Sequence, residues 1–86
     1  MQLRDSWAKT LATVFTVPKP GRIEWAVLES LLRTAGARRI DGHGSRVRFE
    51  KDGEVVTFYR PQQTKDAKQY QLRAARDFLE RIGVTP

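Results

Sequence analysis

The spacing of apolar residues changes at Gly36, and this change constrains the fold more than any other feature of the chain. Before Gly36, apolar residues recur every three to four positions, which is typical of helices with one buried face. After it, apolar and polar residues alternate over Arg46–Glu50 and again over Val55–Tyr59, which is typical of strands. Together, the two patterns predict an α+β fold with a three-stranded antiparallel sheet and helices on one of its faces.

A hairpin is predicted from the dipeptide Asp52-Gly53, because this pair favours the type I′ turn that joins two antiparallel strands. Folding about this turn pairs Phe49 with Val56 and Val47 with Phe58 on the inward face. The outward face then carries Arg46, Arg48, Glu50, Val55, Thr57 and Tyr59.

A third strand is predicted over Ala37–Asp41, with Ile40 pointing inward. Helices are predicted over Ser6–Thr16, Glu24–Ala35 and Ala67–Ile82. The first is expected to be capped by Asp5 or Ser6, and the last by Thr64 or Asp66. The resulting order is helix, helix, three strands, helix. The expected core comprises Leu28, Leu31, Phe49, Val56, Phe58, Leu72, Leu79 and Ile82, with Trp7 and Trp25 packed among the helices.

Charge predicts the kind of partner. Sixteen Lys and Arg residues against ten Asp and Glu give a net charge of +6 and an isoelectric point near 10.3. Such a surface binds a polyanion by releasing the counterions condensed on its phosphates, so a nucleic acid is the expected partner. The chain has no cysteine and no apolar run of membrane-spanning length, from which we expect a cytoplasmic protein without a membrane partner. At 86 residues it has room for one domain and no large cofactor site.

His43 is the candidate catalytic residue. Histidine is the side-chain type whose ordinary pKa lies near neutrality, so it suits proton exchange in acid–base catalysis. Gly42 and Gly44 flank it in a predicted turn. The alternative is that His43 is an exposed bystander. No metal site is expected, because Asp41 and His43 alone are an incomplete set of ligands.

The candidate RNA-binding residues are Arg46, Arg48, Tyr59, Arg60, Lys65 and Lys68. Guanidinium groups suit phosphate, and a tyrosine ring can stack on a base. The two lysines lie near the predicted start of the last helix, where free backbone N–H groups also attract phosphate. The alternative for the strand residues is a solvated face on which Glu50 and Glu54 neutralise the arginines.

A family resemblance is carried by several segments in order: Ile23-Glu24-Trp25, Val27–Leu32, Gly36-Ala37, Gly44–Phe49, Phe58–Pro61 and Leu72–Val84. Over Ile23–Val84 the chain resembles the HicA toxins, which have the α-β-β-β-α arrangement of double-stranded-RNA-binding domains. Met1–Arg22 would be a helical extension of this single domain, which spans residues 1–86. The resemblance implies a metal-independent endoribonuclease that cleaves mRNA, needs no cofactor and is neutralised by a HicB-type antitoxin. Relatives carry a catalytic histidine directly after the Gly-Ser pair, a position that Arg46 occupies here.

Three functions remain open at this point. The first is an endoribonuclease toxin. The second is an RNA-binding domain of the same fold without catalytic activity, and the third is a protein-interaction domain whose basic face meets an acidic partner. No nucleophile triad, phosphate-binding Gly-rich loop or paired-carboxylate motif supports another class of enzyme.

Overall fold

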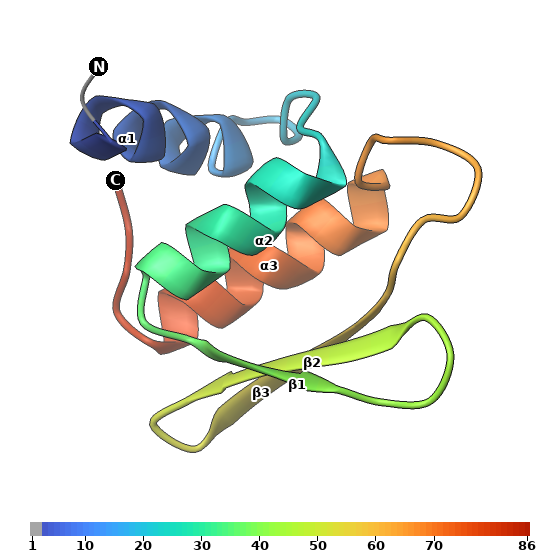
Figure 1. Ribbon diagram of the computed structural model, residues 1–86. Helices are drawn as coiled ribbons and strands as arrows, with labels where there is room; N and C mark the ends of the chain where they lie inside the picture. Colours follow the sequence, from blue (N-terminus) through green and yellow to red (C-terminus); the bar gives the residue numbers. More distant parts are fainter. Residues whose placement is uncertain (1–2) are drawn as a thin grey trace.

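The structure is a computed structural model that describes residues 3–86, with side chains from Trp7 onward. Its elements follow the predicted order (Figure 1). They are α1 (Leu3–Val14), α2 (Trp25–Thr34), β1 (Arg38–Asp41), β2 (Arg46–Lys51), β3 (Glu54–Tyr59) and α3 (Gln69–Arg81). The three strands form one antiparallel sheet, and the helices lie on one side of it. The predicted α+β class is therefore confirmed.

The β2–β3 hairpin has the predicted register. Phe49 lies opposite Val56 and Val47 lies opposite Phe58. The turn places Asp52 at φ 52° and Gly53 at φ 83°, and a type I′ turn needs positive φ at both central positions. The inward apolar side chains of both strands are buried, and the outward side chains face solvent or are half-buried.

The prediction that Ile40 points inward is wrong. Ile40 lies opposite Arg48 and therefore shares the outward face, whereas Arg39 lies opposite Phe49 on the inward face. The buried apolar residue of this segment is Ala37, which directly precedes β1. Arg39 is accommodated because it is half-buried and its guanidinium makes ion pairs with Glu29 of α2, at 3.5 Å, and with Asp41, at 3.1 Å.

The predicted helix ends differ from the observed ones. α1 begins at Leu3, so Asp5 and Ser6 lie within the helix and cannot cap it. α3 begins at Gln69, so neither Thr64 nor Asp66 is its cap. Both belong instead to the connection that precedes α3.

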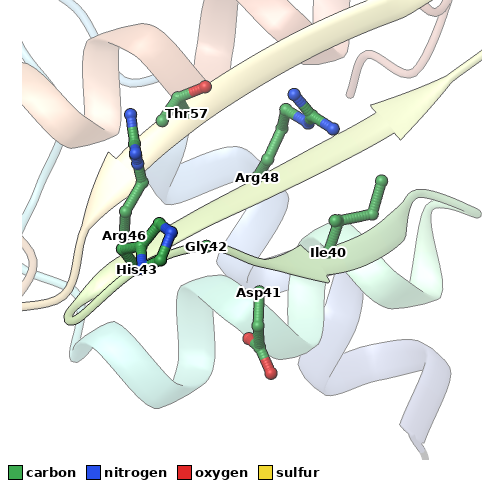
Figure 2. Close-up of a pocket in the computed structure, with 7 residues that line it drawn as sticks. All are labelled: Ile40, Asp41, Gly42, His43, Arg46, Arg48 and Thr57. Atoms are coloured by element: carbon green, nitrogen blue, oxygen red, sulfur yellow. The ribbon is translucent and has the colours of Figure 1, made fainter.

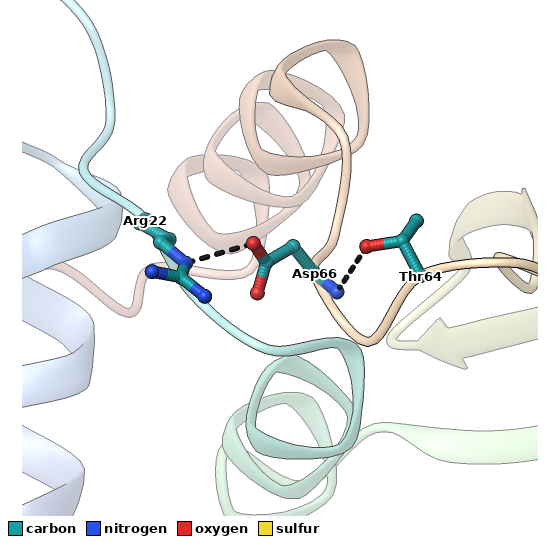
Figure 3. Close-up of polar contacts among 3 residues, drawn as sticks. All are labelled: Arg22, Thr64 and Asp66. Atoms are coloured by element: carbon teal, nitrogen blue, oxygen red, sulfur yellow. Dashed lines mark hydrogen bonds and ion pairs between the residues drawn. The ribbon is translucent and has the colours of Figure 1, made fainter.

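In that connection, the Thr64 hydroxyl accepts a hydrogen bond of 3.1 Å from the Asp66 backbone N–H (Figure 3). The Asp66 carboxylate pairs with Arg22 at 2.7 Å. The backbone N–H of Trp25 donates to the Lys65 carbonyl, and the backbone N–H of Ala67 donates to the Ile23 carbonyl. These bonds fasten the segment before α3 to the start of α2, on the helical side of the molecule.

One hydrophobic cluster fills the space between the sheet and the helices and extends to α1. Leu11 and Val14 of α1 belong to it together with Leu31 of α2 and Leu79 of α3. Seven of the eight predicted core residues are buried; the eighth, Ile82, is partly buried against the cluster. Trp25 is buried against the edge of the Phe58 ring, with ring centroids 5.3 Å apart, and Trp7 is partly buried.

Candidate functional site

The face of the sheet opposite the helices is uncovered, and it carries a shallow hollow of about 260 Å³ (Figure 2). All three strands and the β1–β2 loop contribute to this hollow. Its lining residues are Ile40, Asp41, Gly42, His43, Arg46, Arg48 and Thr57. Three of the predicted site residues, His43, Arg46 and Arg48, are thus brought together by the fold.

The side chains of Arg46 and Arg48 project to the same side of the sheet from successive outward positions of β2 (Figure 2). Among residues 7–86, no carboxylate forms an ion pair with either of them. The alternative in which Glu50 and Glu54 neutralise them is wrong. Glu50 pairs with Arg38, and Glu54 pairs with Arg81. Within residues 7–86, Arg38 and Arg81 are therefore paired with carboxylates, whereas Arg46 and Arg48 beside the hollow are not.

His43 lies in a tight loop that is closed by backbone hydrogen bonds. Gly42 N–H donates to the Arg46 carbonyl at 2.9 Å, and Arg46 N–H donates to the His43 carbonyl at 3.1 Å. The imidazole is exposed, and no side chain among residues 7–86 makes a hydrogen bond with it. Asp41 cannot orient it, because its carboxylate pairs with Arg39 and points away from Ile40, Arg48 and Thr57 (Figure 2).

Tyr59 and Arg60 extend this surface beyond the hollow. Tyr59 is directly opposite Arg46 on the outward face and is 59% exposed. Arg60 follows it and donates its backbone N–H to the Ser45 carbonyl at 2.9 Å, while its guanidinium lies 3.5 Å from the Gly44 carbonyl. Arg60 therefore holds the loop that carries His43 as well as adding charge at its edge.

Lys65 and Lys68 do not line the hollow. They belong to the segment between β3 and α3, and both side chains are exposed. Lys68 is nevertheless tied to the end of β3 through Gln71, a fully buried side chain. The Gln71 amide accepts a hydrogen bond from Lys68 N–H at 2.8 Å and donates one to the Tyr59 carbonyl at 2.7 Å.

Three residues of the hollow were not expected from the sequence: Ile40, Gly42 and Thr57. Ile40 is an apolar residue on an otherwise polar face, a signal that becomes visible only when the register of β1 is known. Thr57 was placed correctly on the outward face but without a role. In the described part of the chain, no three His, Asp or Glu side chains gather as metal ligands would.

The fold and this surface define a class: a small basic α+β protein whose sheet presents unpaired arginines on the face that its helices leave bare. A family model described as "HicA toxin of bacterial toxin-antitoxin" matches residues 25–84, well over half of the chain. The chain belongs to the HicA toxin family. It is therefore a toxin of a toxin-antitoxin system and has a cognate antitoxin as its partner.

The family match begins at Trp25, so α1 lies outside it. No curated protein and no solved structure matches the chain. Within residues 3–86, none of the helices is long and apolar enough to cross a membrane.

Proposed function

We propose that this toxin is an endoribonuclease of the cytoplasm that binds and cleaves mRNA at the hollow, without a metal ion, and that a HicB-type antitoxin neutralises it. The observation that carries this proposal is the pair of unpaired arginines, Arg46 and Arg48, beside His43 on the uncovered face. Unpaired guanidinium groups bind phosphate through paired hydrogen bonds and stabilise the charge that develops at phosphorus.

The reaction is a transesterification followed by release of the product. The ribose 2′-oxygen loses its proton and bonds to the adjacent phosphorus, while the bond from phosphorus to the 5′-oxygen breaks and that oxygen takes up a proton. His43 is the proposed catalytic residue, because its imidazole can exchange a proton at neutral pH from the rim of the hollow. Arg46 and Arg48 bind phosphates of the RNA backbone at the cleavage point, and the Tyr59 ring stacks on a neighbouring base.

Arg60, Lys65 and Lys68 extend the RNA-binding surface toward the start of α3. The buried Gln71 amide joins the end of β3 to Lys68, so these cations keep a fixed place relative to Tyr59. In this proposal they bind the phosphates of the strand beyond the cleavage point, and their contribution is electrostatic and independent of sequence.

A second candidate function is an RNA-binding domain without catalytic activity. It is favoured by one observation: within residues 7–86 no side chain forms a hydrogen bond that would orient the imidazole of His43. Growth arrest separates the two candidates, because the second binds RNA without arresting growth.

The test is the double substitution Arg46→Ala/Arg48→Ala, with Arg33→Ala/Arg73→Ala as its control. The control removes the same charge from exposed helical positions that make no ion pair with the side chains of residues 7–86. When each protein is induced without antitoxin, we expect the parent and the control to arrest growth and fragment mRNA, and the Arg46/Arg48 variant to do neither. For the purified proteins, that variant should also bind RNA more weakly, with a salt dependence reduced by roughly one counterion per lost phosphate contact.

Equal RNA affinity in the folded Arg46/Arg48 variant and its control would exclude this face as the RNA-binding surface. Absence of RNA binding by the parent chain would favour the third function, in which the basic face binds only an acidic protein.

A further inference from the structure

The outward side chains of the sheet form rows, because residues directly opposite each other in antiparallel strands point to the same face. The middle row consists of Ile40 in β1, Arg48 in β2 and Thr57 in β3. All three line the hollow, and Figure 2 shows their side chains on the same side of the sheet. An arginine in the central strand is thus flanked by one apolar side chain and one hydroxyl.

The next row, toward the β1–β2 loop, begins with Gly42, which has no side chain. Gly42 is hydrogen-bonded to Arg46, and Arg46 lies opposite Tyr59. A Cβ atom at Gly42 would lie 3.3 Å from the Arg46 Nε atom and 3.4 Å from its Cβ and Cγ atoms. The Arg46 side chain therefore lies against bare loop backbone at one end of the hollow.

The row on the other side of Arg48 is neutral. It contains Arg38, Glu50 and Val55, and the first two form an ion pair. On the outward face of β2, free positive charge therefore belongs to Arg46 and Arg48, which are separated by two residues, or about 7 Å along the strand. This separation is close to that of successive phosphates in an extended single strand, so two neighbouring phosphates can each meet one arginine.

We propose that the hollow is a base-binding subsite of the RNA site, in which one unpaired nucleobase lies between Ile40 and Thr57. This inference rests on the proposed function. Arg46 and Arg48 bind the phosphates on either side of that nucleotide, Ile40 contacts the face of the base, and the Thr57 hydroxyl bonds to its edge. The hydroxyl both donates and accepts hydrogen bonds, so it distinguishes one base edge from another.

The size of the hollow agrees with a single base. Its volume of about 260 Å³ lies just below the range of about 300–1,000 Å³ that is typical of pockets for drug-sized molecules. In a base pair, the paired edges would be unavailable to Thr57. Despite the resemblance of the fold to domains that bind double-stranded RNA, this subsite requires a single strand.

The test is Thr57→Val, which keeps the shape of the side chain and removes the hydroxyl, with Thr57→Ser as the control that keeps the hydroxyl. Affinities of the purified full chain are measured by fluorescence anisotropy for 2′-O-methyl oligoribonucleotides of adenosine, cytidine and uridine. These probes lack the nucleophilic 2′-hydroxyl and are not cleaved. We expect the parent and the Ser variant to prefer one base, and Thr57→Val to reduce that preference by roughly three- to tenfold, the effect of one hydrogen bond.

The salt dependence of binding should stay unchanged in Thr57→Val, because both arginines remain. Ile40→Ala should weaken binding to all three probes by similar factors, since contact with the face of a base does not depend on its identity. A folded Thr57→Val variant with the base preference of the parent would overturn the subsite, as would equal binding of all probes by the parent or full affinity in Ile40→Ala.

Failure of RNA binding gives a different result, since the parent chain would then bind none of the probes, whereas failure of cleavage alone leaves the parent binding the probes without arresting growth. Binding by the parent without any change in the three variants would remove the base subsite alone.

Discussion

At the scale of single residues, the catalytic proposal depends on His43. We expect His43→Ala, expressed without the antitoxin, to lose mRNA cleavage and growth arrest while still binding RNA through Arg46 and Arg48. The measurement is growth after induction, together with RNA affinity of the purified variant. Because His43 is exposed in its loop, we expect the variant to keep its fold.

Full toxicity in His43→Ala would exclude a role for the imidazole in proton transfer. Catalysis would then rest on charge stabilisation by Arg46 with Tyr59, which lie opposite each other on the sheet. Arg46→Lys tests this second route, because a lysine keeps the charge but not the paired hydrogen-bond donors.

At the scale of elements, hydrogen bonds of the Gln71 side chain connect β3 to the start of α3. Gln71→Leu leaves the buried amide's two backbone partners, the Tyr59 carbonyl and the Lys68 N–H, without their hydrogen bonds. We expect it to lower the free energy of unfolding by about 2–4 kcal/mol, as measured by urea denaturation. The same substitution at Gln63, which is exposed in the preceding loop, should change it by less than about 0.5 kcal/mol. Equal stability of the two variants would show that water replaces the amide.

The elements differ in how well the sequence predicts them. The β2–β3 hairpin was predicted to the residue, because alternation on both strands and the Asp52-Gly53 turn independently specify one register. β1 was not, since its alternation includes a single large apolar residue, Ile40, and the assumption that such a residue points inward is wrong here. Its register is instead set by buried Ala37 and by the Gly42–Arg46 closure of the loop.

The site was predictable to the same extent as the strands that carry it. Arg46, Arg48 and Tyr59 followed from the hairpin register alone. The hollow itself did not, because two of its lining residues, Ile40 and Gly42, take their places from the register of β1. The start of α3 was missed for another reason: Asp66 has a side chain suited to capping but binds Arg22 instead.

At the scale of the whole molecule, α1 contributes to the same core as the segment that matches the family. We propose that residues 1–86 form one domain, in which Leu11 of α1 and Leu79 of α3 unfold together. Leu11→Ala and Leu79→Ala should each cost about 2–5 kcal/mol, because both side chains are buried in this cluster. Thermal unfolding followed by circular dichroism should show one transition, at a lower midpoint in both variants.

Val17→Ala is the control for these substitutions, since Val17 is 77% exposed and its truncation should leave the midpoint unchanged. A second transition in Leu11→Ala, or a midpoint equal to that of the parent, would show that α1 is an appendage to the domain and not part of its core.

The alternation of side chains along β2 also affects how this toxin can diversify. Val47 and Phe49 are fully buried under the helices, whereas Arg46 and Arg48, which alternate with them, are exposed and do not belong to the core. Substitutions at the outward positions of the sheet therefore change the free energy of unfolding little. Many of them can accumulate during evolution before the protein fails to fold. If the proposed function holds, a toxin built in this way can change the RNA that it recognises by mutations that selection for folding does not oppose.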